Sequence, residues 1–157
     1  MANLGCGCPG SMARVIEREE TNNEASTAHV PSELRQWPVQ LHLVPPTAPY
    51  FQNADILVSA DCVAFAVADF NQRWLPGKKL AIACPKLDQG MESYRDKLVA
   101  LVNEAQVKSI SVMIMEVPCC GGLLRVAQDA VARAGRKVPI QTIVIGLDGE
   151  VRREAWA

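Results

Sequence analysis

Hydrophobic and polar positions follow two different periods along this chain, and from residue 54 onward the two periods alternate. Runs rich in Val, Ile and Leu cover residues 55–60, 79–83, 109–115 and 140–145. Such runs are typical of strands that are buried on both faces of a parallel sheet. Between the runs, residues 63–75, 92–106 and 120–134 place apolar side chains at helical spacing. The succession therefore predicts a series of βαβ units.

This alternation predicts an α/β fold with a small, open, mostly parallel sheet and helices on both faces, in a flavodoxin-like or Rossmann-like three-layer arrangement. Ahead of it, residues 39–44 alternate apolar and polar positions and predict a short edge strand, which the prolines after it would end. Residues 1–38 have few apolar positions. We expect an irregular arm over residues 1–38 and a single α/β domain over residues 39–157.

Composition and charge narrow the class of protein. The 157 residues, 49% of them hydrophobic, suffice for one domain with a buried core. A net charge of -1 and scattered Lys and Arg argue against a nucleic-acid partner. No apolar stretch is long enough to cross a bilayer, and the start lacks the pattern of a signal peptide, so we expect no membrane association and a cytoplasmic location.

The six cysteines change this picture, because cytoplasmic cysteines in such number favour metal binding or redox chemistry over structural disulfides. Cys62, Cys84, Cys119 and Cys120 each follow the end of a predicted strand. The carboxyl ends of parallel strands lie at one edge of a sheet, where open α/β sheets bind ligands. Each cysteine also stands at or just before an expected helix start, so we expect the thiols to converge and to ionise readily.

Converging thiolates repel one another unless a cation neutralises them, and soft sulfur ligands select iron–sulfur clusters, zinc or copper(I). The arm adds Cys6 and Cys8, flanked by glycines, which could fold over the site as a lid. Four ligands complete a cubane cluster or a zinc site, so a set of up to six suggests a larger or non-cubane cluster, or ligands that exchange with redox state. Cys6 is the weakest candidate ligand.

Other interpretations of the cysteines stay open at this point. A zinc site could organise a structural or interaction module, or Cys119 or Cys120 could be the nucleophile of a metal-free enzyme. Any single cysteine could also be an apolar filler of the core. Asp61, Lys86 and Glu116 should lie near the same edge, as proton donors, counter-charges or solvated charges. The chain has no glycine-rich nucleotide motif and no Cys-x-x-Cys pair.

Several blocks of this sequence resemble the carboxy-terminal domain of ferredoxin-type (4Fe-4S) iron-sulfur cluster-binding proteins of anaerobic bacteria. The blocks are Cys8-Pro9-Gly10-Ser11, residues 34–41, Ala60-Asp61-Cys62, Cys84-Pro85-Lys86-Leu87-Asp88 and residues 116–121. The resemblance implies an iron–sulfur protein of anaerobic redox metabolism, either an oxidoreductase or its electron-transfer component. The residues of this chain that match the family's cysteines are Cys8, Cys62, Cys84, Cys119 and Cys120.

The chain departs from that family in one respect. The ferredoxin module that usually precedes the domain, with its Cys-x2-Cys-x2-Cys-x3-Cys-Pro run, is missing from this sequence. Either the sequence is a shortened form of a longer protein, or electrons come from a separate ferredoxin or another redox partner protein. A homo-oligomer is compatible with the sequence as well.

Overall fold

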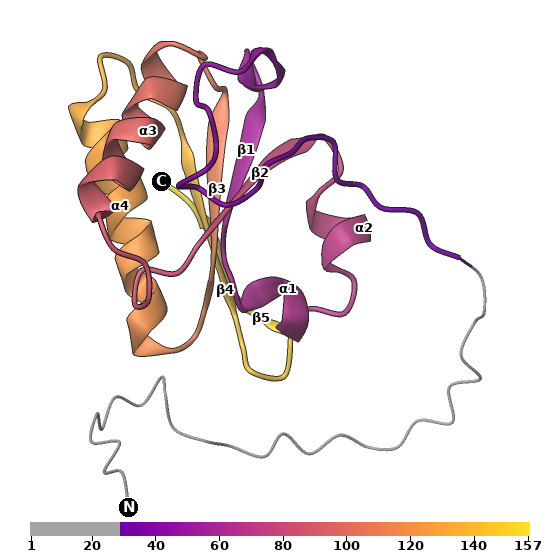
Figure 1. The fold of residues 1–157 in the computed structure, drawn as a ribbon. Coiled ribbons are helices and arrows are strands. Elements are labelled where there is room, and N and C mark those ends of the chain that lie inside the picture. Colours follow the sequence, from indigo (N-terminus) through magenta and orange to yellow (C-terminus); the bar gives the residue numbers. More distant parts are fainter. Residues whose placement is uncertain (1–28) are drawn as a thin grey trace, which may run out of the picture.

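The computed structural model describes residues 29–157, which form an open α/β sheet with helices on both faces (Figure 1). Five strands make one sheet. They are β1 (Asp55–Ala60), β2 (Lys78–Ala83), β3 (Ser109–Met115), β4 (Ile140–Ile145) and β5 (Val151–Trp156). The helices are α1 (Val63–Ala66), α2 (Phe70–Trp74), α3 (Met91–Asn103) and α4 (Gly121–Arg133), with the 3-10 turns η2 (Pro49–Phe51) and η3 (Pro118–Cys120).

The strand order is β2-β1-β3-β4-β5, and only β5 is antiparallel to its neighbour. From β1 the chain moves outward to β2, whereas from β3 it moves in the opposite direction to β4. The strand order therefore reverses between β1 and β3. In open α/β sheets this point marks the crevice at the carboxyl edge where ligands bind.

Helices α3 and α4 lie side by side on one face of the sheet, while the short helices α1 and α2 lie on the other (Figure 1). The core between these layers is built from apolar side chains of the strands and the facing sides of the helices, such as Ile56, Val112 and Leu123. Strand β3 is buried along its whole length, as expected for a strand covered on both faces. In residues 29–157 no helix is both long enough and apolar enough to cross a membrane.

The structure confirms the predicted fold class and the four parallel strands, and β1, β3 and β4 have the predicted bounds. The helix expected over residues 63–75 was wrong as a single element, because extended backbone at Val67 divides it into α1 and α2. The edge strand expected over residues 39–44 was also wrong. Only Gln40 forms a bridge, to Ile82, and the chain then turns, since the N–H of Val44 donates to the Gln40 carbonyl at 3.0 Å.

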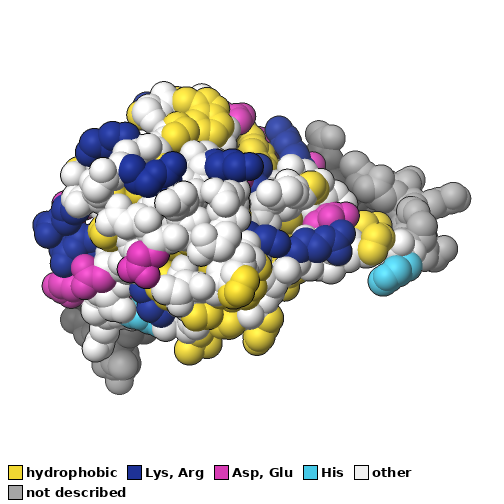
Figure 2. All heavy atoms as spheres, turned by 90° about the horizontal axis from the view of Figure 1, so that it is seen from above, with side chains coloured by type: hydrophobic (Ala, Val, Ile, Leu, Met, Phe, Trp, Pro, Cys, Tyr) yellow, Lys and Arg dark blue, Asp and Glu magenta, His cyan; other side chains and the backbone are white. Residues whose placement is uncertain are grey.

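The amino edge of the sheet, where the parallel strands begin, carries basic side chains (Figure 2). Arg136 Nη1 donates to the carbonyl of Val102 at 3.2 Å, in the last turn of α3. Lys137 Nζ donates to the carbonyl of Val131 at 3.3 Å, in the last turn of α4. Cations at these positions satisfy carbonyls that the helices leave unpaired and oppose the negative end of each helix dipole.

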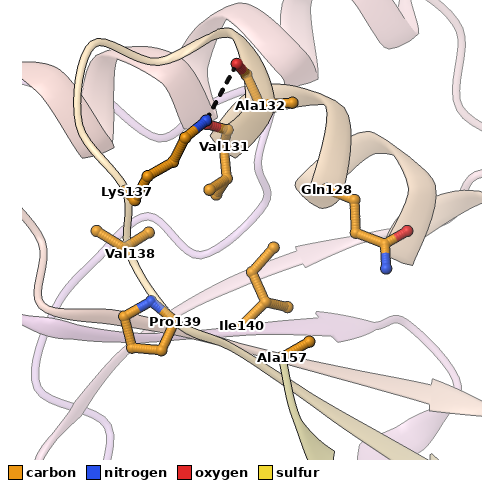
Figure 3. A pocket seen from close by; sticks show the side chains of 8 residues that line it. All are labelled: Gln128, Val131, Ala132, Lys137, Val138, Pro139, Ile140 and Ala157. Carbon is orange, nitrogen blue, oxygen red and sulfur yellow. Dashed lines mark hydrogen bonds between the residues drawn. The ribbon is translucent and has the colours of Figure 1, made fainter.

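A hollow of about 540 Å³ lies beside these helix ends, between α4 and the first residues of β4 (Figure 3). Its walls are mostly apolar. The charged group among the lining side chains is the ammonium of Lys137, which already donates to carbonyls of α4. This edge therefore uses its charges to stabilise the fold.

Candidate functional site

Four cysteines lie at the carboxyl edge of the sheet, as the sequence predicts. Cys62 follows β1 and is the residue before α1, and Cys84 follows β2 directly. Cys119 and Cys120 belong to η3, which joins β3 to α4. The loops after β1 and β3 flank the point where the strand order reverses, and the loop after β2 adjoins them because β1 pairs with β2.

The thiols are close enough to influence one another's charge. Burial raises the pKa of Cys62, and the nearby Cys84, Asp61 and Cys119 raise it further. Burial also raises the pKa of Cys120 to about 11, with contributions from Cys119 and Cys62 and an opposing hydrogen bond from the Met115 backbone. Side chains far apart in the sequence therefore share one electrostatic environment.

These shifts correct one expectation. The pKa values of Cys62 and Cys120 are raised rather than lowered, because burial and crowding with other acidic groups outweigh any help from the helix ends. The expected helix start after Cys84 was wrong too, since a turn follows and α3 begins only at Met91. Cys6 and Cys8 lie outside the described residues.

Two of the cysteine loops pack closely against each other. A methyl group at Gly122 would lie 3.1 Å from the Cβ of Pro85, which is closer than ordinary van der Waals packing allows. Gly122 is the second residue of α4, and Pro85 follows Cys84. The small residue therefore lets the start of α4, with Cys119 and Cys120, approach the Cys84 loop closely.

A hydrogen-bond network around Asp88 holds the Cys84 loop in place. The Asp88 Oδ2 atom accepts the backbone N–H of Cys84 at 2.8 Å, the hydroxyl of Tyr94, and Gln40 Nε2 at 3.3 Å. The N–H of Asp88 donates back to the Cys84 carbonyl at 2.9 Å. Tyr94 is fully buried in α3, and Gln40 lies in the chain beside β2. The loop is thus tied to the core.

Asp61 is the acidic residue nearest the thiols. Its backbone N–H donates to the Ala83 carbonyl at 3.1 Å, which joins the ends of β1 and β2. Its Oδ1 atom is buried and, among residues 29–157, has no hydrogen-bond partner. Burial raises the pKa of Asp61, and the charge of Asp88 raises it further. An unpaired buried oxygen at this edge is the kind of group that a bound ligand would satisfy.

The other charged candidates do not join the thiols. Glu116 Oε1 accepts the N–H of Leu147 at 3.0 Å, and its Oε2 accepts Arg152 Nε at 3.1 Å, so it braces the turn between β4 and β5. Lys86 is exposed to solvent. His42 bonds the Gln89 carbonyl through Nε2 at 2.7 Å, in the segment between β2 and α3.

The described part of the chain contains no group of three or more histidine, cysteine, aspartate or glutamate side chains that could hold a metal ion. The four thiols come together as neighbours at one edge, while any contribution from Cys6 and Cys8 falls outside the described residues. Gln40, Asp88 and Tyr94 were not singled out from the sequence. The one signal for Asp88 in the sequence is its place as the last residue of the block Cys84-Pro85-Lys86-Leu87-Asp88.

Comparison with known proteins agrees with this architecture. A model of the Rossmann-like domain family matches residues 48–156, which is more than half of the chain. The chain belongs to the Rossmann-like domain family. The matched region begins just before η2 and includes all five strands and the four cysteines after them. Membership in this Rossmann-like family accounts for the strand order and the edge at which the thiols lie.

A relative in Archaeoglobus fulgidus, an uncharacterized protein, is 29% identical over 119 residues. The match covers 76% of this chain and 83% of that protein. No solved structure matches the chain. The Rossmann-like description names a fold and no ligand, so the resemblance to iron–sulfur proteins stays a prediction.

Proposed function

We propose that the carboxyl edge of this Rossmann-like domain binds an iron–sulfur cluster and that the protein serves electron transfer or small-molecule redox chemistry. Cys62, Cys84, Cys119 and Cys120 would supply ligands from the described residues, with Cys8 as a fifth and Cys6 in a lesser role. The observation that most supports this proposal is the convergence of four thiols from the ends of three adjacent parallel strands.

The donor set fits such a cluster. Cysteine thiolates are the usual ligands of both 4Fe-4S and larger clusters, and soft metals prefer them over oxygen donors. A cluster places iron and sulfide atoms between its ligands. The cysteine sulfur atoms therefore do not need to contact one another, and neighbouring loops can supply them. The Asp88 network and the Gly122 contact hold two of these loops in fixed positions, as a preformed site requires.

The surroundings of the thiols support a redox role. Cys62 is exposed, which would leave one side of the site accessible to a separate ferredoxin or other redox partner protein. Cys120 is buried, and low solvent exposure is one of the factors that set the reduction potential of a cluster. Asp61 adds a carboxyl group beside the thiols, which could accept a hydrogen bond from a small bound molecule.

Anaerobic purification tests this proposal. We expect iron and acid-labile sulfide in the protein, visible absorption that bleaches on reduction, and an electron paramagnetic resonance signal in one redox state. Cys119→Ser and Cys120→Ser should lose or alter these signals. Cys6→Ser, which removes the same kind of thiol from the weakest candidate position, should keep them.

The same measurements separate the alternatives. One equivalent of zinc without sulfide, unchanged by reduction, would replace the cluster with a structural zinc module. A colourless protein without iron or zinc would reject both metal proposals. A metal-free cysteine nucleophile would then require rapid alkylation of one thiol at neutral pH, against which the raised pKa of Cys120 argues.

A further inference from the structure

A second hollow, of about 580 Å³, lies at the carboxyl edge, between α1 and the turn that joins β4 to β5. One wall is α1 and the segment after it, with Phe65 and Asp69; α2 adds Arg73, and the turn between β4 and β5 forms the opposite wall through Asp148 to Glu150. Its volume falls in the range of about 300–1,000 Å³ that small-molecule sites occupy. Phe65 follows Cys62 by three residues, and its N–H donates to the Cys62 carbonyl at 3.3 Å.

The two walls of the hollow are fixed against each other. Gly149 has φ +90°, and a methyl group there would lie 2.3 Å from the Ala66 carbonyl oxygen, so the turn rests directly on the end of α1. Arg152 binds this turn from the other side, through Nη2 to Asp148 at 2.6 Å and Nε to Glu116 at 3.1 Å. A ligand would therefore enter a preformed site and would lose little affinity to ordering the protein.

The hollow exposes an aromatic ring. The Phe65 side chain is 94% exposed, and leaving such a ring in water costs roughly 1.5–3 kcal/mol compared with burying it. A ligand seated in the hollow would cover part of the ring. The face of a phenyl ring also attracts cations through its quadrupole.

The charged groups of the hollow are predominantly negative. Three carboxylates, on Asp69, Asp148 and Glu150, line it together with the guanidinium of Arg73, and Asp148 is already paired with Arg152. Within residues 29–157, the carboxylates of Asp69 and Glu150 make no hydrogen bond or ion pair. The Arg73 guanidinium lies over the Trp74 ring, 4.8 Å from its centroid. An excess of carboxylate beside an open aromatic ring favours a cationic ligand.

We propose that this hollow binds a small organic cation, namely a primary amine attached to an apolar group. The ammonium group would lie between Asp69 and Glu150, and the apolar group would pack on Phe65. No lining residue is a cysteine, so this inference stands or falls independently of the proposed cluster.

Three small compounds of similar shape and different charge test the proposal. Isotope-labelled full-length protein is titrated with 2-phenylethylammonium, 2-phenylethanol and phenylacetate, and amide chemical shifts are followed by NMR. We expect saturable shifts in residues 65–69 and 148–150 with the amine, weaker shifts with the alcohol and none with the acid. Equal responses to all three compounds, or shifts elsewhere only, would overturn the inference.

Single substitutions assign the contacts. Asp69→Asn and Glu150→Gln should each weaken binding of the amine by up to about fivefold, which corresponds to one exposed charge pair of about 1 kcal/mol. Phe65→Ala should weaken binding of the amine and the alcohol alike, and it should leave stability unchanged because the ring is exposed. Glu104→Gln removes an exposed charge at the amino edge and should leave affinity unchanged. Affinities that stay equal in all four variants would reject the site.

Discussion

The polar groups at the two edges of the sheet differ in whether they have partners within the protein. At the amino edge, Arg136 and Lys137 donate to carbonyls in the last turns of α3 and α4. At the carboxyl edge, Asp61 keeps a buried oxygen without a partner among the described residues, and Asp69 and Glu150 are left to solvent. Four thiols gather at the carboxyl edge, while none of the described cysteines lies at the amino edge.

This difference separates stability from candidate function within one fold. Charges that complete helix ends lower the free energy of the folded chain and leave nothing for a ligand to satisfy. A buried group that lacks a partner raises that free energy, and the Asp61 oxygen is such a group beside the point where the strand order reverses. Substitutions at the amino edge should therefore affect stability alone, whereas those at the carboxyl edge should affect stability and binding together.

Paired glycine substitutions give the largest expected contrast. Gly149 and Gly77 both have positive φ, at +90° and +76°, but only Gly149 has backbone atoms in the space that a methyl group would occupy. Gly77→Ala, near the start of β2, should cost about 1–2 kcal/mol from the left-handed backbone. Gly149→Ala should add an overpacking cost of about 1–3 kcal/mol. Chemical denaturation measures both, and equal losses would show that the contact with Ala66 is unimportant.

The Asp88 network offers the next largest effect. Asp88→Ala removes the acceptor of the Cys84 N–H and of the buried Tyr94 hydroxyl, and an unpaired buried donor costs roughly 1–3 kcal/mol. Asp88→Asn keeps an oxygen acceptor and should recover much of that loss. We expect Asp88→Ala to lower the metal content of anaerobically purified protein as well as its melting temperature.

Arg136→Ala at the amino edge is the control for that change. It removes a side chain that bonds the Val102 and Val107 carbonyls, so stability should fall by roughly 1–3 kcal/mol. Metal content should not change, because the substitution lies at the opposite edge. A parallel loss of metal in Arg136→Ala would mean that general destabilisation, rather than the Cys84 loop, controls binding.

Much of the fold was predictable from the sequence because the parallel strands are buried on both faces. Their continuous apolar runs gave the bounds of β1, β3 and β4 directly. β5 was missed, since it lies at the edge of the sheet and its Arg152, Arg153 and Glu154 face solvent. The break between α1 and α2 was missed because it depends on a tertiary contact, the approach of Gly149 to the Ala66 carbonyl.

The site was predictable in position and less so in detail. The convergence of Cys62, Cys84 and Cys119 follows from strand ends alone, since parallel strands all end at one edge. The role of Asp88 depends on a turn and on a tyrosine whose position in α3 looks like part of an apolar stripe. The raised pKa of Cys62 depends on burial and on neighbours that only the folded chain brings together.

A smaller effect should come from the two glycines that begin α4. Gly122→Ala places a methyl group 3.1 Å from Pro85 and should push the Cys119 loop away from the Cys84 loop. Gly121→Ala is the matched control, since no atom lies within 4 Å of the added group. We expect lower metal content in Gly122→Ala than in Gly121→Ala at similar melting temperatures. The same metal content in both variants would show that the contact does not set the spacing of the loops.

The smallest effect concerns the ion pairs of the β4–β5 turn. Backbone and Arg152 hydrogen bonds hold the pKa of Glu116 below its usual value, so its contribution to stability is present above the pKa of the unfolded chain. That contribution disappears as pH falls through the lower, folded-state pKa. Glu116→Gln should therefore lower the melting temperature slightly at pH 7, and the difference from the unmodified protein should shrink in acid and in high salt. A difference that stayed constant from pH 7 to pH 3 would contradict a contribution from the Glu116 charge, because glutamine can still accept the Leu147 N–H.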